Sequence, residues 1–125
     1  MTSDPELDPY LPPEYQPNVI VVMAKSRSPG IWRAAGGAIS AEELGIPPEL
    51  AGRLGHWSRD LAALITDMAA PQRTERLRQL AAEGLAFARQ VQATIGPEFV
   101  VLYFDEAKLE AEAAFTEYLY PAGTA

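Results

Sequence analysis

The sequence contains no cysteine and only one histidine among its 125 residues. The lack of cysteine excludes disulfide bonds, thiolate metal ligands and cysteine nucleophiles. A single imidazole leaves little for a metal cage or a catalytic triad. Most kinds of enzyme are therefore disfavoured, and we expect a non-catalytic protein that uses no cofactor and no metal.

Long apolar segments are also lacking, since the longest runs, 19–24 and 99–104, have six residues each. A membrane-spanning helix needs about 20 apolar residues. The first 17 residues contain no Lys or Arg and so lack the basic start of an export signal. These absences predict a soluble, cytoplasmic protein that makes no contact with membranes.

Basic residues are scarce relative to acidic ones, with 10 Lys and Arg against 17 Asp and Glu and a net charge of -7. The negative charge is concentrated at the two ends, with −4 in residues 1–17 and −5 in residues 98–125. This balance disfavours nucleic acid and anionic membranes as partners and favours a basic protein.

The remaining composition is typical of a folded domain, with 48% hydrophobic and 22% charged residues. We expect one domain over residues 18–125, preceded by an extended arm over residues 1–17 that contains five prolines. Such an arm either lies over its own domain or docks on a partner. Its apolar anchors are Leu7, Tyr10, Leu11 and Tyr15.

Two aliphatic segments, 18–25 and 98–104, predict buried strands because their apolar residues do not alternate with polar ones. A less secure strand is expected over residues 31–34, after a turn at residues 26–30. The sequence leaves open whether the two main strands pair parallel or antiparallel.

A capping box begins a short helix at Ser40. Its hydroxyl is expected to accept from the backbone N–H of Glu43, while the Glu43 side chain reaches back to the Ser40 N–H. Gly45 suits the left-handed position that ends the helix.

Apolar residues at helical spacing predict two longer helices, one from Pro47-Pro48 to Met68 and one from Pro71 to about Ile95, which form an antiparallel hairpin. Gly52 and Gly55 each cost about 1 kcal/mol in the first of these helices. That cost is more easily tolerated if another backbone approaches closely there. The arginines of the second helix are predicted on a solvated face; they are Arg73, Arg76, Arg78 and Arg89.

Asp105 is expected to cap a third helix over residues 106–120, which Pro121 ends. The order of elements predicts an α+β fold, in which a two- or three-stranded sheet is covered by an antiparallel helical hairpin plus a C-terminal helix. A mostly helical bundle is the competing fold.

Two pairs of residues suit acid–base or metal chemistry. His56 and Asp60 are four residues apart on a predicted helix, where the carboxylate would orient the imidazole as a general base. Asp105 and Glu106 are adjacent acids that could hold a hard cation. A surface histidine and a helix cap explain the same residues without chemistry.

The acidic residues of the predicted third helix are the candidate partner-binding site. Glu106, Glu110 and Glu117 fall near one face of that helix, with Glu112 and Asp105 in support. Such a face either attracts a basic partner or serves as a solubilising exterior. Trp32 and Trp57 could anchor an interface, although core packing suits both.

Several segments are similar to small, acidic bacterial proteins, some of which resemble immunity partners of secreted or contact-delivered toxins. The similar residues are packing and turn residues within about 31–105, so the resemblance implies a binding function and supplies no catalytic residue. They are Trp32-Arg33, Ser40 to Gly45, Leu50 to Trp57, Glu83 to Ala86, and Ile95-Gly96-Pro97 with the strand that follows.

Together these features favour an immunity or antitoxin protein that occludes the active site of a basic toxin with an acidic surface. A nuclease toxin is basic because it holds phosphates, and a row of carboxylates can imitate them. The alternative is an adaptor or regulatory module that docks through the proline-rich arm. The oligomeric state is left open.

Overall fold

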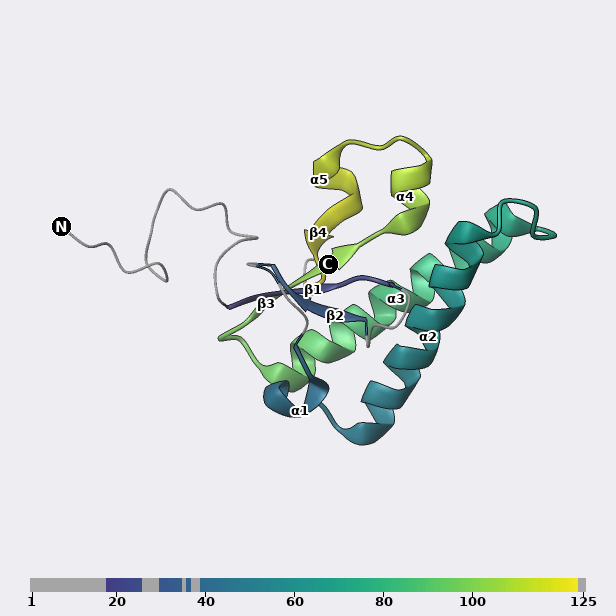
Figure 1. The fold of residues 1–125 in the computed structure, drawn as a ribbon. Coiled ribbons are helices and arrows are strands. Elements are labelled where there is room, and N and C mark those ends of the chain that lie inside the picture. The colour runs from purple at the N-terminus through teal and green to yellow at the C-terminus, as the bar shows by residue number, and fades with distance from the viewer. Residues whose placement is uncertain (1–17, 26–29, 35, 37–38, 124–125) are drawn as a thin grey trace.

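The computed structural model describes residues 18–25, 30–34, 36 and 39–123, so the predicted arm at residues 1–17 lies outside the described residues. The described part contains strands and helices in the α+β arrangement that the sequence predicts (Figure 1). In chain order they are β1 (Val19–Val22), β2 (Ile31–Arg33), α1 (Ala41–Leu44), α2 (Pro48–Thr66), α3 (Arg73–Ile95), β3 (Val100–Phe104), α4 (Glu106–Glu110), α5 (Phe115–Tyr118) and β4 (Leu119–Pro121).

The sheet has four strands in the order β2-β1-β3-β4, one more than the upper expectation from sequence. The two aliphatic strands β1 and β3 are central and pair in parallel, with Val21 opposite Leu102. The outer strands β2 and β4 pair antiparallel with them. The parallel pair requires a long crossover, and the hairpin of α2 and α3 supplies it.

The helical hairpin covers one face of the sheet, as predicted (Figure 1). Its core side chains Leu54, Trp57 and Leu61 are at most 3% exposed. The Trp57 indole N–H donates to the Leu80 carbonyl at 2.8 Å, so this large side chain is buried with its polar atom satisfied. From β3, the Tyr103 hydroxyl donates to the Ala81 carbonyl at 2.6 Å. These two hydrogen bonds fix α3 against both α2 and the sheet.

Of the two hydrogen bonds expected in the capping box at α1, one is confirmed. The backbone N–H of Glu43 donates to Ser40 Oγ at 3.2 Å, and Gly45 takes the left-handed conformation with φ 75°. The Glu43 carboxylate accepts from Arg33 Nη2 at 3.0 Å in place of the expected Ser40 N–H. Arg33 of β2 lies within reach, so α1 is tied to the sheet edge.

The prediction of one helix over residues 106–120 is wrong. The segment forms two short helices, α4 and α5, and then strand β4. A continuous helix of 15 residues would carry the chain about 22 Å along one axis, whereas β4 must return to pair with β3. Glu112 lies in the reversal between α4 and α5 with φ 60°. Pro121 is tolerated in β4 because that strand is at the sheet edge.

Within the described residues, no helix has both the length and the apolar character needed to cross a membrane.

Candidate functional site

The predicted acidic site lies on a segment that leaves the end of β3 and returns as β4. We call residues 105–118 the C-terminal excursion; it contains α4 and α5 (Figure 1). Because α4 ends at Glu110, the face that was expected to align Glu106, Glu110 and Glu117 does not exist. The five predicted residues lie on one excursion but in different environments, which decide what each can do.

Asp105 faces the inside of the excursion and is 8% exposed. Its Oδ1 accepts from the backbone N–H of Lys108 at 3.2 Å, which confirms the predicted helix cap. Its Oδ2 accepts from the Tyr120 hydroxyl at 2.9 Å. Burial and this hydrogen bond raise the pKa of Tyr120 to about 12. Asp105 therefore joins the start of the excursion to β4 and is not exposed to a partner.

Glu106 is also buried, with 9% of its surface exposed. Burial, together with the nearby carboxylates of Glu110 and Asp105, raises its pKa to about 7. A carboxyl group that is half-protonated near neutral pH contributes less negative charge than the sequence count assumes. Glu106 therefore supplies little of the expected acidic surface.

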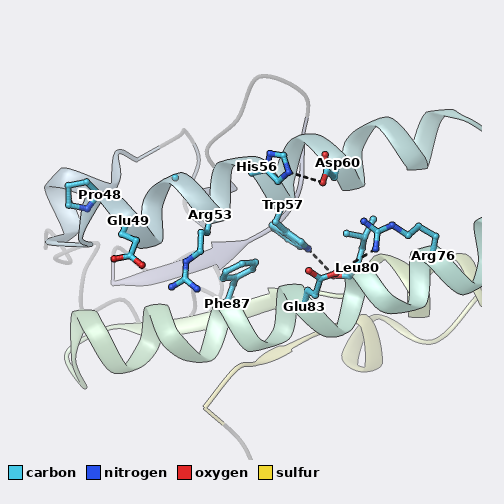
Figure 2. Close-up of a pocket in the computed structure, with 11 residues that line it drawn as sticks. Pro48, Glu49, Arg53, His56, Trp57, Asp60, Arg76, Leu80, Glu83 and Phe87 are labelled. Atoms are coloured by element: carbon cyan, nitrogen blue, oxygen red, sulfur yellow. Dashed lines mark hydrogen bonds and ion pairs between the residues drawn. The ribbon is translucent and has the colours of Figure 1, made fainter.

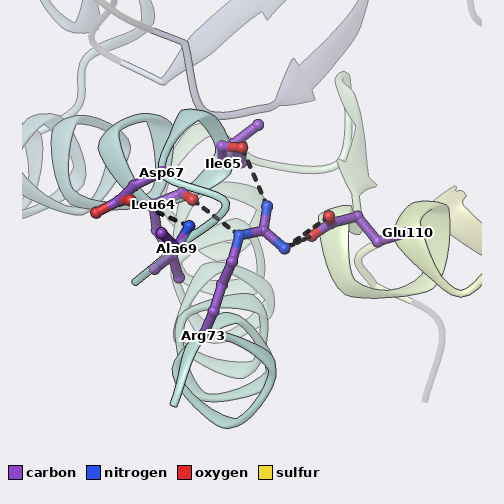
Figure 3. Close-up of polar contacts among 6 residues, drawn as sticks. All are labelled: Leu64, Ile65, Asp67, Ala69, Arg73 and Glu110. Carbon is purple, nitrogen blue, oxygen red and sulfur yellow. Dashed lines mark hydrogen bonds and ion pairs between the residues drawn. The ribbon is translucent and has the colours of Figure 1, made fainter. Parts of the chain in front are cut away.

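Glu110 is held by Arg73, the first residue of α3 (Figure 3). Arg73 Nη1 donates to both carboxylate oxygens of Glu110, at 2.8 and 3.1 Å. Its Nε donates to the Leu64 carbonyl at 3.2 Å and its Nη2 to the Ile65 carbonyl at 3.0 Å. One guanidinium thus satisfies two carbonyls at the end of α2 and holds α4 beside the helical hairpin.

The predicted solvated face of α3 is wrong for Arg73, whose side chain is 13% exposed. Arg89 Nε donates to the Ala122 carbonyl at 3.3 Å, so α3 also contacts the chain just after β4. The sequence contained an indication that Arg73 contacts α2. The last carbonyls of a helix need hydrogen-bond donors, and α2 has no basic residue in its last turn, so a donor from another element was required.

Three predicted acids are exposed, and one of them, Glu110, is paired with Arg73; the other two are Glu112 in the reversal and Glu117 in α5. Neither forms an ion pair within the part of the chain that the structure describes. We call Glu112 and Glu117 the acidic tip. It is the portion of the predicted acidic surface that is free to meet a cationic group.

The helical hairpin carries a second candidate site, a groove of about 430 Å³ between α2 and α3 (Figure 2). His56 Nε2 lies 3.3 Å from Asp60 Oδ2, so the expected pair forms. Both side chains are well exposed, at 72% and 42%, and no lining residue carries a hydroxyl nucleophile. No group of three or more metal-ligating side chains occurs among the described residues. The structure therefore places His56 on the surface, which is one of the two interpretations that the sequence allowed.

The two tryptophans are on opposite faces of the sheet. Trp57 is in the core, as expected, at 3% exposure. Trp32 of β2 lies on the face away from the helical hairpin, where its indole N–H donates to the Met23 carbonyl at 3.2 Å and the Lys25 ammonium lies 5.0 Å from its ring centroid. Trp32 is thus the tryptophan within reach of a ligand or partner.

The described residues form a small α+β domain with exposed, charged surfaces. Residues 18–106 match the Serratia CdiI immunity protein-like family, and the chain belongs to that family. This confirms the resemblance to immunity partners of toxins and supports a toxin-neutralising role. Comparison with the curated proteins gives no match.

Proposed function

We propose that this chain neutralises a cognate toxin by binding it, and that the toxin surface it covers is basic. The observation that carries the proposal is membership of the Serratia CdiI immunity protein-like family across residues 18–106. The net charge of -7 supports a basic partner, because opposite charges speed association and select among partners. The chain acts by occupying the toxin's active site and transforms no substrate.

The binding surface is the C-terminal excursion, with the acidic tip as its contact. Glu112 and Glu117 lie beyond residue 106, outside the range that matches the family. An immunity protein must distinguish its own toxin from related ones, and a surface outside the shared pattern suits that requirement. Glu110 borders this surface, but its charge is largely neutralised by Arg73 at 2.8 Å.

The buried acids have a supporting role in this proposal. Asp105 caps α4 and accepts from Tyr120, so it fixes the direction in which the excursion leaves β3. Glu106 is the first residue of α4 and its buried one. Changing either residue would alter the shape of the excursion, so neither change by itself reports on toxin contact.

The proposal is tested by measuring the Kd between the full chain and the toxin domain encoded in the neighbouring reading frame. Reversing both charges of the acidic tip, with Glu112→Lys and Glu117→Lys, is expected to weaken binding about 10- to 100-fold. The weakening should shrink at high salt, because exposed charges are then screened.

The matched control is Glu42→Lys with Glu98→Lys, which changes the net charge equally at two exposed acids outside the excursion. This control is expected to bind the toxin domain nearly as the wild-type chain does. Equal weakening by both double variants would show that only total charge matters and would contradict the acidic tip as the contact. Unchanged binding by the tip variant would contradict it as well.

A further inference from the structure

The face of the sheet opposite the helical hairpin is apolar. Val19, Val21 and Leu102 point to this side and form a cluster separate from the main core. Neither α2 nor α3 lies on this side (Figure 1). We call it the outer sheet face; the side chains around its centre are Met23, Trp32, Ala34, Phe104 and Leu119.

A shallow depression of about 380 Å³ crosses the outer sheet face. Its lining includes Trp32 from β2, Phe104 from β3 and Phe115 from α5, so aromatic rings occur along its length. Phe115 is 50% exposed. Together with the neighbouring rings it belongs to an apolar patch, and such patches mark interaction sites. The cations Lys25 and Arg33 also line the depression.

We propose that the outer sheet face is the docking site of the chain's own N-terminal arm, residues 1–17. The arm joins the domain at residue 18, directly before β1, which is a central strand of the sheet. In an extended polyproline conformation, 17 residues reach about 50 Å. Four strands at about 4.8 Å spacing are about 15 Å across. The arm is therefore long enough to turn back at residue 18 and cross the face.

The composition of the arm suits an aromatic depression. Its five prolines lack backbone N–H donors, so the arm is unsuited to adding a strand to the sheet and must dock mainly through side chains. Proline-rich segments bind in aromatic-lined grooves because their conformation is set before binding and little entropy is lost. The apolar residues that would fill the depression are Leu7, Tyr10, Leu11 and Tyr15.

The charges of the two surfaces are complementary. The arm has four acidic residues and no Lys or Arg. Lys25 lies 5.0 Å from the Trp32 ring centroid and has no carboxylate partner among the described residues. Arg33, which also pairs with Glu43 at 3.0 Å, is half-exposed. The acids of the arm thus meet unneutralised positive charge on an otherwise acidic protein.

The two tryptophans provide the test, since Trp32 lies on the outer sheet face and Trp57 lies in the core. In the full chain, Leu7, Tyr10, Leu11 and Tyr15 are all changed to Ser, and the two indole N–H resonances are followed by NMR. The Trp32 resonance is expected to shift. It is also expected to broaden when a soluble paramagnetic agent is added, because the indole is then exposed to solvent. The Trp57 resonance is expected to stay in place, which shows that the fold is intact.

The matched control changes Thr2, Ser3 and Gln16 to Ala, which retains the apolar anchors and acids of the arm. It is expected to leave Trp32 at its wild-type resonance. A second variant replaces the four acids Asp4, Glu6, Asp8 and Glu14 by their amides. It is expected to shift Trp32 in the same direction as the loss of the anchors, as is high salt added to the wild-type chain.

The proposal is overturned if the Trp32 indole N–H has the same chemical shift in the anchor variant as in the wild-type chain. If that resonance instead moves with the concentration of the wild-type chain, a second copy covers the face. If it moves only when the toxin domain is added, the toxin covers it. The arm experiment contains no toxin, so its failure and the failure of the proposed immunity function are separate results.

Discussion

Gly84 of α3 lies where the helix approaches Trp57 and Tyr103 most closely. A Cβ at this position would overlap the Trp57 ring and the Tyr103 hydroxyl. From the sequence, a close backbone approach was one explanation for Gly52 and Gly55, and the structure shows none at either glycine. A Cβ at Gly52 meets nothing within 4 Å, and one at Gly55 meets only the end of the Arg59 side chain. Helix propensity identifies a costly glycine but does not say which glycine faces a bulky neighbour.

We predict that Gly84→Ala lowers the free energy of unfolding by about 1–3 kcal/mol, because an overpacked core must shift to admit the methyl group. Gly52→Ala is the control, since this glycine is exposed and also within a helix. It should raise the free energy of unfolding by about 0.5–1 kcal/mol. Urea unfolding of both variants checks the pair, and equal effects would show that the packing around Gly84 is not as described.

Glu106 predicts a dependence of stability on pH. Its pKa is raised from 4.5 to about 7, first by burial and then by Glu110 and Asp105. Between these two pH values the folded state binds the proton and the unfolded state releases it, so the contribution of Glu106 to stability falls as pH rises. Above about pH 7 the folded protein must bury the charge.

Glu106→Gln should therefore unfold with a higher free energy than wild type at pH 8, by about 1–3 kcal/mol, because each pKa unit corresponds to about 1.4 kcal/mol. The difference should shrink towards zero at pH 4.5. Urea unfolding across this pH range measures it. Glu117→Gln is the control because it makes the same change at an exposed glutamate. An effect of equal size in this control would contradict the assignment to Glu106.

Arg73 joins the helical hairpin to the C-terminal excursion. It contacts carbonyls of α2 and the carboxylate of Glu110 in α4. We predict that Arg73→Ala lowers the free energy of unfolding more than Glu110→Ala does. The arginine change also removes the hydrogen-bond donor to the Leu64 and Ile65 carbonyls. A double-mutant cycle should give a coupling of about 1 kcal/mol, at the upper end for partly exposed ion pairs.

The exposed ion pair of Glu75 and Arg78 on α3 is the control for this cycle, with side-chain exposures of 53% and 72%. Its coupling should be close to zero, because solvent screens it. Hydrogen exchange of the α4 amides supplies a second measurement, and these amides should exchange faster in Arg73→Ala. A coupling no larger than that of the control pair would show that Arg73 does not hold α4.

The long helices and aliphatic strands could be predicted because each has a local pattern: apolar residues at helical spacing, or a short β-branched run. The C-terminal excursion could not. Residues 106–114 are mostly good helix formers. The pairing of Tyr120 with Tyr103 that turns the chain back depends on β3, which lies earlier in the chain and outside the segment whose propensity is considered. Tertiary pairing here overrides local propensity. The predicted acidic face is absent for the same reason, since Glu110 and Glu117 lie on two separate helices.

For the molecule as a whole, the net charge and the resemblance to immunity proteins could be predicted from the sequence, whereas the burial of individual acids could not. The resemblance to toxin-immunity proteins is confirmed by the family match over residues 18–106. Which acids are exposed depended on the packing of Asp105 and Glu106, which no spacing rule reveals. The outer sheet face could not be predicted either. A strand whose apolar residues do not alternate with polar ones is expected to be covered on both faces, but its sequence does not say which segment covers each face.

The most direct test is a titration of the purified full chain into an activity assay of a cognate toxin domain, which is sought in the neighbouring reading frames. Neutralisation by binding predicts that toxin activity falls to its limit at one chain per toxin domain. It also predicts that both proteins remain intact and separable in denaturant. Full toxin activity at a large excess of the chain, or loss of activity at a small fraction of one equivalent, would contradict it.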